Sequence, residues 1–173
     1  MRPQRRQPRP LATRRPALEL GALGATPSGL ALHFERVLHA PRPVVFNACI
    51  EPEELAKWWG PAGFTSPSIE IDPRVGGSYR IAMQPPDGEL FYLRGEFREV
   101  DPPNRLVYTF TWEDPTPDDQ ETVVTLSFGD LGRDTALVLD QRPFATEARR
   151  ALHEAGWTDG LDRLEASLRS QQD

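Results

Sequence analysis

The chain has 173 residues, of which 38% are hydrophobic and 27% charged, and a formal net charge of −6. At roughly 150 residues per domain, this length predicts a single domain. The one cysteine, Cys49, excludes an internal disulfide framework and a cysteine-rich zinc site. No stretch approaches the roughly 20 apolar residues of a membrane-spanning helix, and the negative charge disfavours nucleic acid. We therefore expect a cytoplasmic protein that binds neither membranes nor nucleic acids.

The first 29 residues differ from the rest of the chain. They hold six arginines and five prolines without an amphipathic period, so we expect a disordered, basic, Arg/Pro-rich leader over 1–29 and one folded domain over 30–173. Three other interpretations of the leader stay open. It could be a twin-arginine export signal, a basic arm that touches nucleic acid or membrane, or a non-native extension from a misplaced start codon.

A strand and two short helices are predicted to open the domain. The segment Leu32–Leu38 alternates as a strand does, and Val44–Ile50 carries the apolar stripe of a short helix. A second helix is expected from Glu51 through Trp58 and Trp59 to a Gly-Pro turn, with its carboxylates at the positive end of the helix dipole. Adjacent helical residues point about 100° apart, so the two indoles are expected to face different directions. Packing in the core is the usual role of a tryptophan; the alternative is that one packs inward and the other lines the mouth of a cavity.

The middle of the chain is predicted to be β-structure. Six further strands are expected, over Ser68–Ile71, Ser78–Met83, Leu90–Val100, Arg105–Trp112, Thr122–Phe128 and Thr135–Gln141. Turn-forming Gly, Pro, Asn and Asp separate them, and connections this short favour antiparallel neighbours. The acidic stretch 113–121 is expected to form a longer exposed loop.

A long helix is predicted over Thr146–Ser170. Its apolar stripe is formed by Leu152, Trp157, Leu161, Leu164 and Leu168. It is the one predicted element long enough to cover the apolar face of the sheet. We therefore predict an α+β fold, in which a curved antiparallel seven-stranded sheet surrounds a long C-terminal helix and two short helices follow the first strand. Sheet and helix are expected to leave a space between them, which is the candidate site.

Large side chains on the inner faces of these elements are candidates to bind a ligand. They are Trp58, Tyr79, Met83, Leu93, Tyr108, Phe110, Trp112, His153 and Trp157. His153 precedes Trp157 by one helical turn, so both are expected on one face of the helix. Its imidazole could donate a hydrogen bond to a ligand carbonyl or act as a general base, and Arg36 is a second candidate to orient a ligand. We assign no catalytic residue.

The sequence contains no recognisable metal-binding or cofactor-binding motif. The three histidines and Cys49 lack metal-ligand spacing. The chain holds no phosphate-binding loop, dinucleotide fingerprint or Gly-x-Ser-x-Gly nucleophile motif. We therefore expect neither a metal nor a cofactor.

Several strings in the body of the chain carry a resemblance to a known family. They are Ala40–Phe46, Glu51–Pro61, Asp72–Gly77, Gly95–Pro103, Arg105–Trp112 and His153–Trp157. Taken in this order over residues 32–168, they resemble the SRPBCC (START-like, helix-grip) superfamily. Within it, the chain is most similar to the family named for the C-terminal domain of the activator of the heat-shock-protein-90 ATPase.

The resemblance implies a helix-grip fold and several possible functions. The superfamily holds lipid carriers, polyketide cyclases, stress-response proteins and co-chaperones, so a particular activity follows only by analogy. We expect a protein that binds a small apolar or aromatic molecule without defined chemistry, as a monomer or homodimer. The alternatives are a co-chaperone-like module that binds a chaperone or another protein, and a polyketide cyclase-like enzyme.

Overall fold

The computed structural model describes residues 29–171. The predicted leader over 1–29 lies outside these residues except for Gly29. Within the described part of the chain, every helix is too short or too polar to cross a membrane.

Seven antiparallel strands form one sheet, as predicted. They are β1 (Leu30–Leu38), β2 (Ile69–Ile71), β3 (Ser78–Met83), β4 (Phe91–Asp101), β5 (Arg105–Trp112), β6 (Thr122–Leu131) and β7 (Asp134–Phe144). Their order across the sheet is β1-β7-β6-β5-β4-β3-β2. Consecutive strands from β2 to β7 are therefore neighbours, and β1 forms one edge of the sheet beside β7. Each neighbouring pair is antiparallel.

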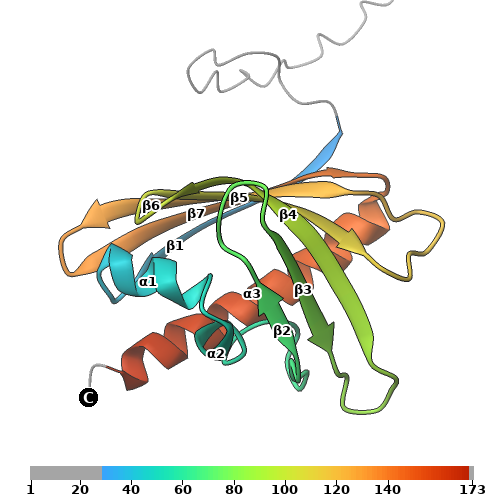
Figure 1. The fold of residues 1–173 in the computed structure, drawn as a ribbon, viewed down its shortest axis with the longest axis horizontal. Coiled ribbons are helices and arrows are strands. Elements are labelled where there is room, and N and C mark those ends of the chain that lie inside the picture. The colour runs from blue at the N-terminus through green and yellow to red at the C-terminus, as the bar shows by residue number, and fades with distance from the viewer. Residues whose placement is uncertain (1–28, 172–173) are drawn as a thin grey trace, which may run out of the picture.

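Three helices lie on the concave side of this sheet. They are α1 (Arg42–Ala48), α2 (Pro52–Leu55) and α3 (Glu147–Ser170). Figure 1 shows α3 running beneath the arched sheet, with α1 and α2 on the same side. The hydroxyl of Thr146 caps α3 by accepting a hydrogen bond from the backbone N–H of Arg149 at 3.2 Å. This arrangement confirms the predicted α+β, helix-grip architecture.

The second short helix is shorter than the sequence predicts. It ends at Leu55, and the residues that follow form turns, so Trp58 and Trp59 are not on a helix. Both indoles are buried, and the expectation that the two face different surroundings is wrong. A 100° separation applies only inside a regular helix, whereas turn backbone brings both side chains to the inside.

Gly95 lies in β4 where the neighbouring strands β3 and β5 leave no room for a side chain. A Cβ atom at this position would overlap the carbonyl oxygen of Thr109 and the ring of Tyr79. The pairing of β4 with β5 also shifts register between Phe97 and Glu99, an irregularity that bends a strand and increases its twist. Both features place the bend of the sheet in β4.

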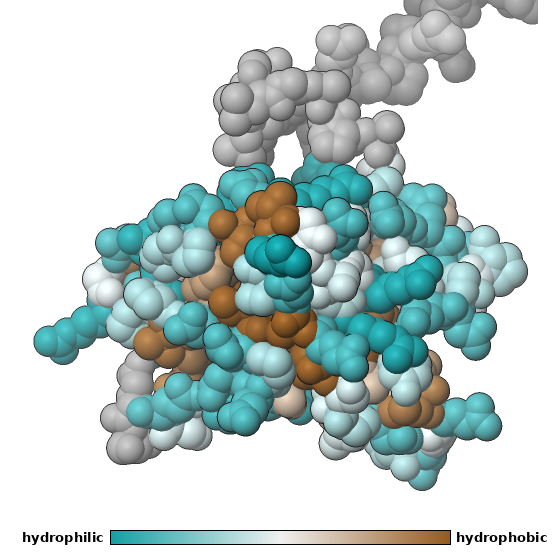
Figure 2. Space-filling view, in the orientation of Figure 1, coloured by the Kyte–Doolittle hydropathy of each residue, from teal (hydrophilic) through white to brown (hydrophobic). Residues whose placement is uncertain are grey.

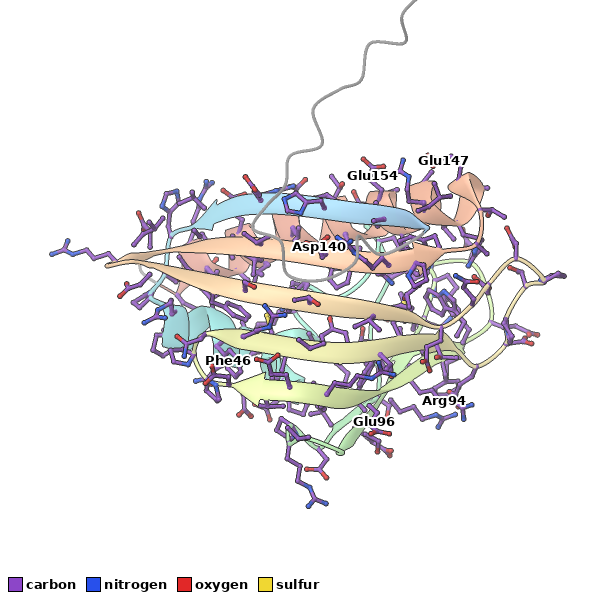
Figure 3. All side chains as sticks on the ribbon, turned by 90° about the horizontal axis from the view of Figure 1, so that it is seen from above. Phe46, Arg94, Glu96, Asp140, Glu147 and Glu154 are labelled. Atoms are coloured by element: carbon purple, nitrogen blue, oxygen red, sulfur yellow. The ribbon has the colours of Figure 1, made fainter. Side chains whose placement is uncertain are left out.

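The two faces of the sheet differ in polarity. Figure 3 looks onto the outer face, where Arg94, Glu96 and Asp140 project from the strands, with α3 behind the sheet. The inner face and the helices enclose a continuous core that includes Phe46 and Leu164. Figure 2 shows apolar side chains in the middle of one side of the molecule, among mostly hydrophilic ones.

The stripe predicted for α3 is confirmed over its C-terminal half and wrong at its start. Trp157, Leu161, Leu164 and Leu168 are buried, but Leu152 is 54% exposed. Helical spacing alone placed Leu152 on the inner face. In the structure this first part of α3 borders a cavity rather than the packed core.

Candidate functional site

One cavity of about 330 Å³ lies between the first half of α3, the turn segment after α2, and strands β3 to β5. Seven of its eighteen lining residues are aromatic: Trp58, Trp59, Phe64, Phe91, Phe110, Trp112 and Trp157. Its polar lining is Asp114, Thr116, Asp119, Arg149 and His153. The remaining lining residues are Gly60, Pro61, Met83, Leu152, Gly156 and Gly160. The volume is in the range of small-molecule sites, which are mostly apolar with a few placed polar groups.

All four tryptophans of the chain line this cavity. The ring centroids of Trp58 and Trp59 are 5.7 Å apart, and those of Trp59 and Trp157 are 5.3 Å apart. The Trp58 indole donates a hydrogen bond of 2.8 Å to the carbonyl oxygen of Ala48. A buried tryptophan usually needs such a partner, so this bond fixes the indole ring as a rigid wall.

Helix α3 holds the turn segment that carries Trp58 and Trp59. Arg163 donates hydrogen bonds to the carbonyl oxygens of Trp59 and Gly60, each at 3.3 Å. Gly160 permits the close approach, because a Cβ atom there would lie 3.3 Å from the carbonyl oxygen of Trp58. Helix and turn segment therefore form one wall of the cavity together.

A buried polar relay holds the third tryptophan. The indole N–H of Trp157 donates to Oε1 of Gln141 at 2.7 Å, and Nε2 of Gln141 donates to Oγ1 of Thr122 at 2.8 Å. Gln141 has no solvent exposure. A buried amide is stable only when its polar atoms are paired, and here both partners also fix α3 against β6 and β7.

His153 lies at the same wall, in contact with three aromatic rings. Its centroid is 4.9 Å from that of Phe144, 5.2 Å from Phe110 and 5.7 Å from Trp112. The indole N–H of Trp112 donates to Nε2 of His153 at 3.2 Å. Burial lowers the pKa of His153 to about 4, helped by the positive charge of Arg149. The imidazole is therefore neutral at pH 7.

The loop between β5 and β6 is fastened to the start of α3. Asp119 accepts hydrogen bonds from the backbone N–H and the hydroxyl of Thr116, at 2.8 and 2.9 Å. Nε of Arg149 lies 2.6 Å from Oδ1 of Asp119. The side chains of Arg149 and Asp119 are only 18% and 8% exposed, so the expectation of a solvated acidic loop over 113–121 is wrong at Asp119. Each partner compensates the charge of the other, so neither charge is left unpaired in this partly buried position.

The structure gathers two thirds of the candidate binding residues around the cavity. Trp58, Met83, Phe110, Trp112, His153 and Trp157 line it. The prediction that His153 and Trp157 share a face of the helix is confirmed by this common lining. Arg36 lies elsewhere and forms an ion pair of 2.7 Å with Asp162.

The other three candidates lie outside this cavity, which corrects the expected lining. Tyr79 and Tyr108 pack ring to ring at 5.3 Å and border a much smaller space beside Cys49. Leu93 is completely buried. Each faces inward as the alternation predicts. However, a strand advances about 3.3 Å per residue, so Tyr79 stands roughly four residues from the cavity end of β3 at Met83. Strand periodicity gives the face of a residue but not its depth along the sheet.

Several lining residues could not be found by these arguments. Phe64 belongs to a turn segment without regular periodicity. Phe91 lies on the alternating face of its predicted strand, but alternation alone does not show that this end of the strand borders the cavity. Arg149 and Asp119 are 30 positions apart and meet only in the folded chain. Gly156 carried a signal, since a glycine inside a helix costs about 1 kcal/mol relative to alanine and is usually there for a packing or functional reason.

Among the described residues, no group of three or more His, Cys, Asp or Glu side chains is arranged to hold a metal ion. The ionisable groups around the cavity are the Arg149–Asp119 ion pair, the carboxylate of Asp114 and the neutral His153. The arrangement is suited to hold an apolar molecule in a fixed orientation.

Comparison with known proteins gives the same architecture. A family model described as Activator of Hsp90 ATPase homolog 1-like protein matches residues 39–169. A search of curated proteins found no match. A crystal structure from Chromobacterium violaceum is 29% identical, covers 80% of this chain and 96% of its own, and superposes with a TM-score of 0.72.

Two further structures extend the likeness. The AHSA1 protein of Silicibacter pomeroyi is 28% identical, covers 82% of this chain and 99% of its own, and has a TM-score of 0.72. A protein of Arthrobacter aurescens is 21% identical, covers 82% of this chain and 87% of its own, and has a TM-score of 0.73. At 21% identity, the Arthrobacter aurescens structure supports a shared fold only.

Proposed function

The chain belongs to the family of Activator of Hsp90 ATPase homolog 1-like proteins, and from this premise we propose that its cavity binds a small, largely apolar, aromatic molecule in the cytoplasm. The observation that carries the proposal is the enclosure of about 330 Å³ by all four tryptophans of the chain. Transfer of apolar ligand surface from water contributes about 25 cal/mol per Å². Rigid aromatic walls add ring contacts without a large loss of side-chain entropy.

A binding role accounts for His153 better than a catalytic one. A general base works best with a pKa near the operating pH, whereas burial lowers the pKa of His153 to about 4. Its Nε2 lone pair is already occupied by the indole N–H of Trp112. Arg149 and Asp119 neutralise each other at 2.6 Å. These groups are better suited to orient a molecule than to convert it, which favours binding over a cyclase-like reaction.

A docking site for another protein would require a continuous apolar surface. The large hydrophobic side chains that are exposed in the described residues are spread over β1, α1, β6, α3 and the loops before β3 and β4. They are Leu30, Val37, Val44, Val75, Leu90, Leu131 and Leu152. The family's co-chaperone alternative therefore has less support from the surface than ligand binding has from the cavity.

The test uses the indole N–H resonances of the four tryptophans as reporters. Titration with 2-isopropenylnaphthalene, an uncharged aromatic hydrocarbon, should shift these resonances together and saturate at one molecule per chain. Gly156→Leu should abolish the shifts because it places a side chain at the cavity wall, where a Cβ atom would meet only Pro61 at 3.8 Å. Ala155→Leu, on the exposed side of the same helix, is the matched control. Equal binding by both variants, or no shift of the four indole resonances in the wild type, would refute the proposal.

A further inference from the structure

The hydrogen bond between Trp112 and His153 fixes which imidazole nitrogen carries the proton. A tryptophan indole can only donate, so Nε2 of His153, 3.2 Å from the Trp112 nitrogen, must be the unprotonated acceptor. In a neutral imidazole the proton then resides on Nδ1. Within the described residues, Nδ1 has no acceptor. His153 therefore brings a free N–H donor to the cavity wall.

Arg149 supplies further donors one helical turn away. Positions four apart lie on the same face of a helix, and both side chains line the cavity. Nε of Arg149 lies within ion-pair distance of Asp119, but the Nε–H group forms no hydrogen bond. Its Nη groups likewise have no hydrogen-bond acceptor among residues 29–171. The guanidinium thus has its charge balanced and its donors unused.

The other polar groups of the lining are largely occupied. The indole N–H groups of Trp58 and Trp157 are bonded to Ala48 and Gln141. Asp119, the buried acceptor, already receives two hydrogen bonds from Thr116. The inner wall therefore has unused donors, while its buried carboxylate is already engaged. A ligand that completes this wall must carry a hydrogen-bond acceptor.

The charges of the lining argue that this acceptor is neutral. The positive charge of Arg149 is paired with the carboxylate of Asp119, and Asp114 adds a second carboxylate to the lining of the same cavity. No positive charge is left to compensate an anionic ligand, and burying an unpaired carboxylate is costly. A carbonyl oxygen accepts hydrogen bonds without bringing a charge.

We propose that the cavity selects uncharged aromatic molecules that carry a carbonyl group, and that the Nδ1–H of His153 and the Nη–H groups of Arg149 bind the carbonyl oxygen. This inference rests on the proposed function, because it assigns the polar end of the ligand in the same cavity. His153 and Arg149 are its specificity-determining residues, while the tryptophans provide the apolar contact.

Three probes of similar shape separate the possibilities by calorimetry. They are 2-acetylnaphthalene, its hydrocarbon isostere 2-isopropenylnaphthalene, and the anion 2-naphthoate. The variant is the double substitution Arg149→Met with Asp119→Asn, which leaves no buried carboxylate without its cation. Arg150→Met is the control, since Arg150 instead pairs with Glu147 at 2.6 Å. His153→Phe, which keeps a ring and removes the donor, is a second variant.

The wild type and the control should bind the ketone more tightly than the hydrocarbon. In the double variant, the ratio of ketone affinity to hydrocarbon affinity should fall about tenfold, as expected for the loss of one or two hydrogen bonds. His153→Phe should lower the ratio in the same direction. The infrared carbonyl stretch of the bound ketone should lie at lower frequency in the wild type than in either variant. Continued binding of the hydrocarbon shows that the variants keep their cavity, and the ratio of the two affinities removes any change in apolar packing that both probes share.

The outcomes distinguish this inference from the proposed function. Hydrocarbon binding with an equal ketone-to-hydrocarbon ratio in wild type and variants overturns carbonyl recognition and leaves cavity binding standing. Tighter binding of 2-naphthoate than of the ketone overturns the choice of a neutral ligand. Failure of all three probes to bind overturns the proposed function, and this inference with it.

Discussion

The indole nitrogen of Trp157 lies 2.7 Å from Oε1 of Gln141, so a strand residue with no solvent exposure holds a wall of the cavity in place. The contact crosses from α3 to β7. Because Gln141 also donates to Thr122 at 2.8 Å, one amide joins a helix and two strands in the interior.

Gln141→Leu should destabilise the protein by about 1–3 kcal/mol, because it leaves the N–H of Trp157 and the hydroxyl of Thr122 buried without a partner. Urea unfolding monitored by circular dichroism measures this loss. Gln120→Leu is the matched control, since its amide donates to the carbonyl oxygen of Pro143 at an exposed site. A similar loss of unfolding free energy in both variants would show that the buried hydrogen bonds of Gln141 stabilise the protein no more than an exposed one does.

Gly156→Ala and Gly160→Ala should change stability in opposite directions. Both glycines lie inside α3, where alanine gains about 1 kcal/mol over glycine. At Gly156 a Cβ atom meets only Pro61 at 3.8 Å, whereas at Gly160 it would press on the backbone oxygen of Trp58 at 3.3 Å. The melting temperature should therefore rise for Gly156→Ala and fall for Gly160→Ala. A higher melting temperature for both variants would show that the turn segment after α2 moves at little energetic cost to make room for the new methyl group.

The stability of the protein should depend on His153 in weakly acidic solution. Burial lowers the pKa of His153 from 6.5 to about 4, so between these values the unfolded chain binds a proton that the folded chain does not. The stabilising effect of a neutral His153 is complete above pH 6.5 and is lost as the pH falls toward 4. Over that window the loss is of the order of 3 kcal/mol.

The measurement compares urea unfolding of the wild type and His153→Phe from pH 4 to 7. The pH dependence due to His33, whose pKa is raised first of all by its hydrogen bond to Glu35, is common to both proteins and cancels. The removed Trp112 hydrogen bond adds only a constant offset. Parallel pH profiles for the two proteins would contradict the buried, neutral state of His153.

Cys49 should react with a thiol reagent only when the protein unfolds. Its burial raises the thiol pKa to about 12, and the thiolate is the reactive species. At pH 8 the native protein should be unreactive toward dithionitrobenzoate, and one thiol should appear across the urea transition, in step with circular dichroism. Rapid labelling without urea would indicate that α1 opens locally.

The elements that the sequence predicts best are those whose pattern is local. Strands β3 and β5 have the predicted bounds, Ser78–Met83 and Arg105–Trp112, because alternation and turn residues define them within a few positions. The long helix is also predicted to within a residue of its start, since Thr146 is a good cap. The covering of the sheet by this helix follows because no other predicted element could bury its apolar face.

The predictions that fail depend on contacts between distant segments. Helical spacing could not show that α2 ends at Leu55, so the joint inward packing of Trp58 and Trp59 was missed. The burial of Asp119 depends on Arg149, with which it shares no local pattern. Tyr108 and Trp112 lie on one predicted face, but only the bend of the sheet decides which of them reaches the cavity.

Three of the four tryptophans that line the cavity, Trp58, Trp59 and Trp157, are also part of the hydrophobic core, and Trp112 packs against it. Occupancy of the cavity and folding are therefore thermodynamically linked. A molecule that fills the space and binds only the folded chain stabilises it by RT ln(1 + [L]/Kd). At concentrations about a hundred times Kd this amounts to about 2.7 kcal/mol. Turnover by proteases that attack the open chain would then slow as the molecule accumulates, and the cellular amount of the protein would follow the supply of its ligand.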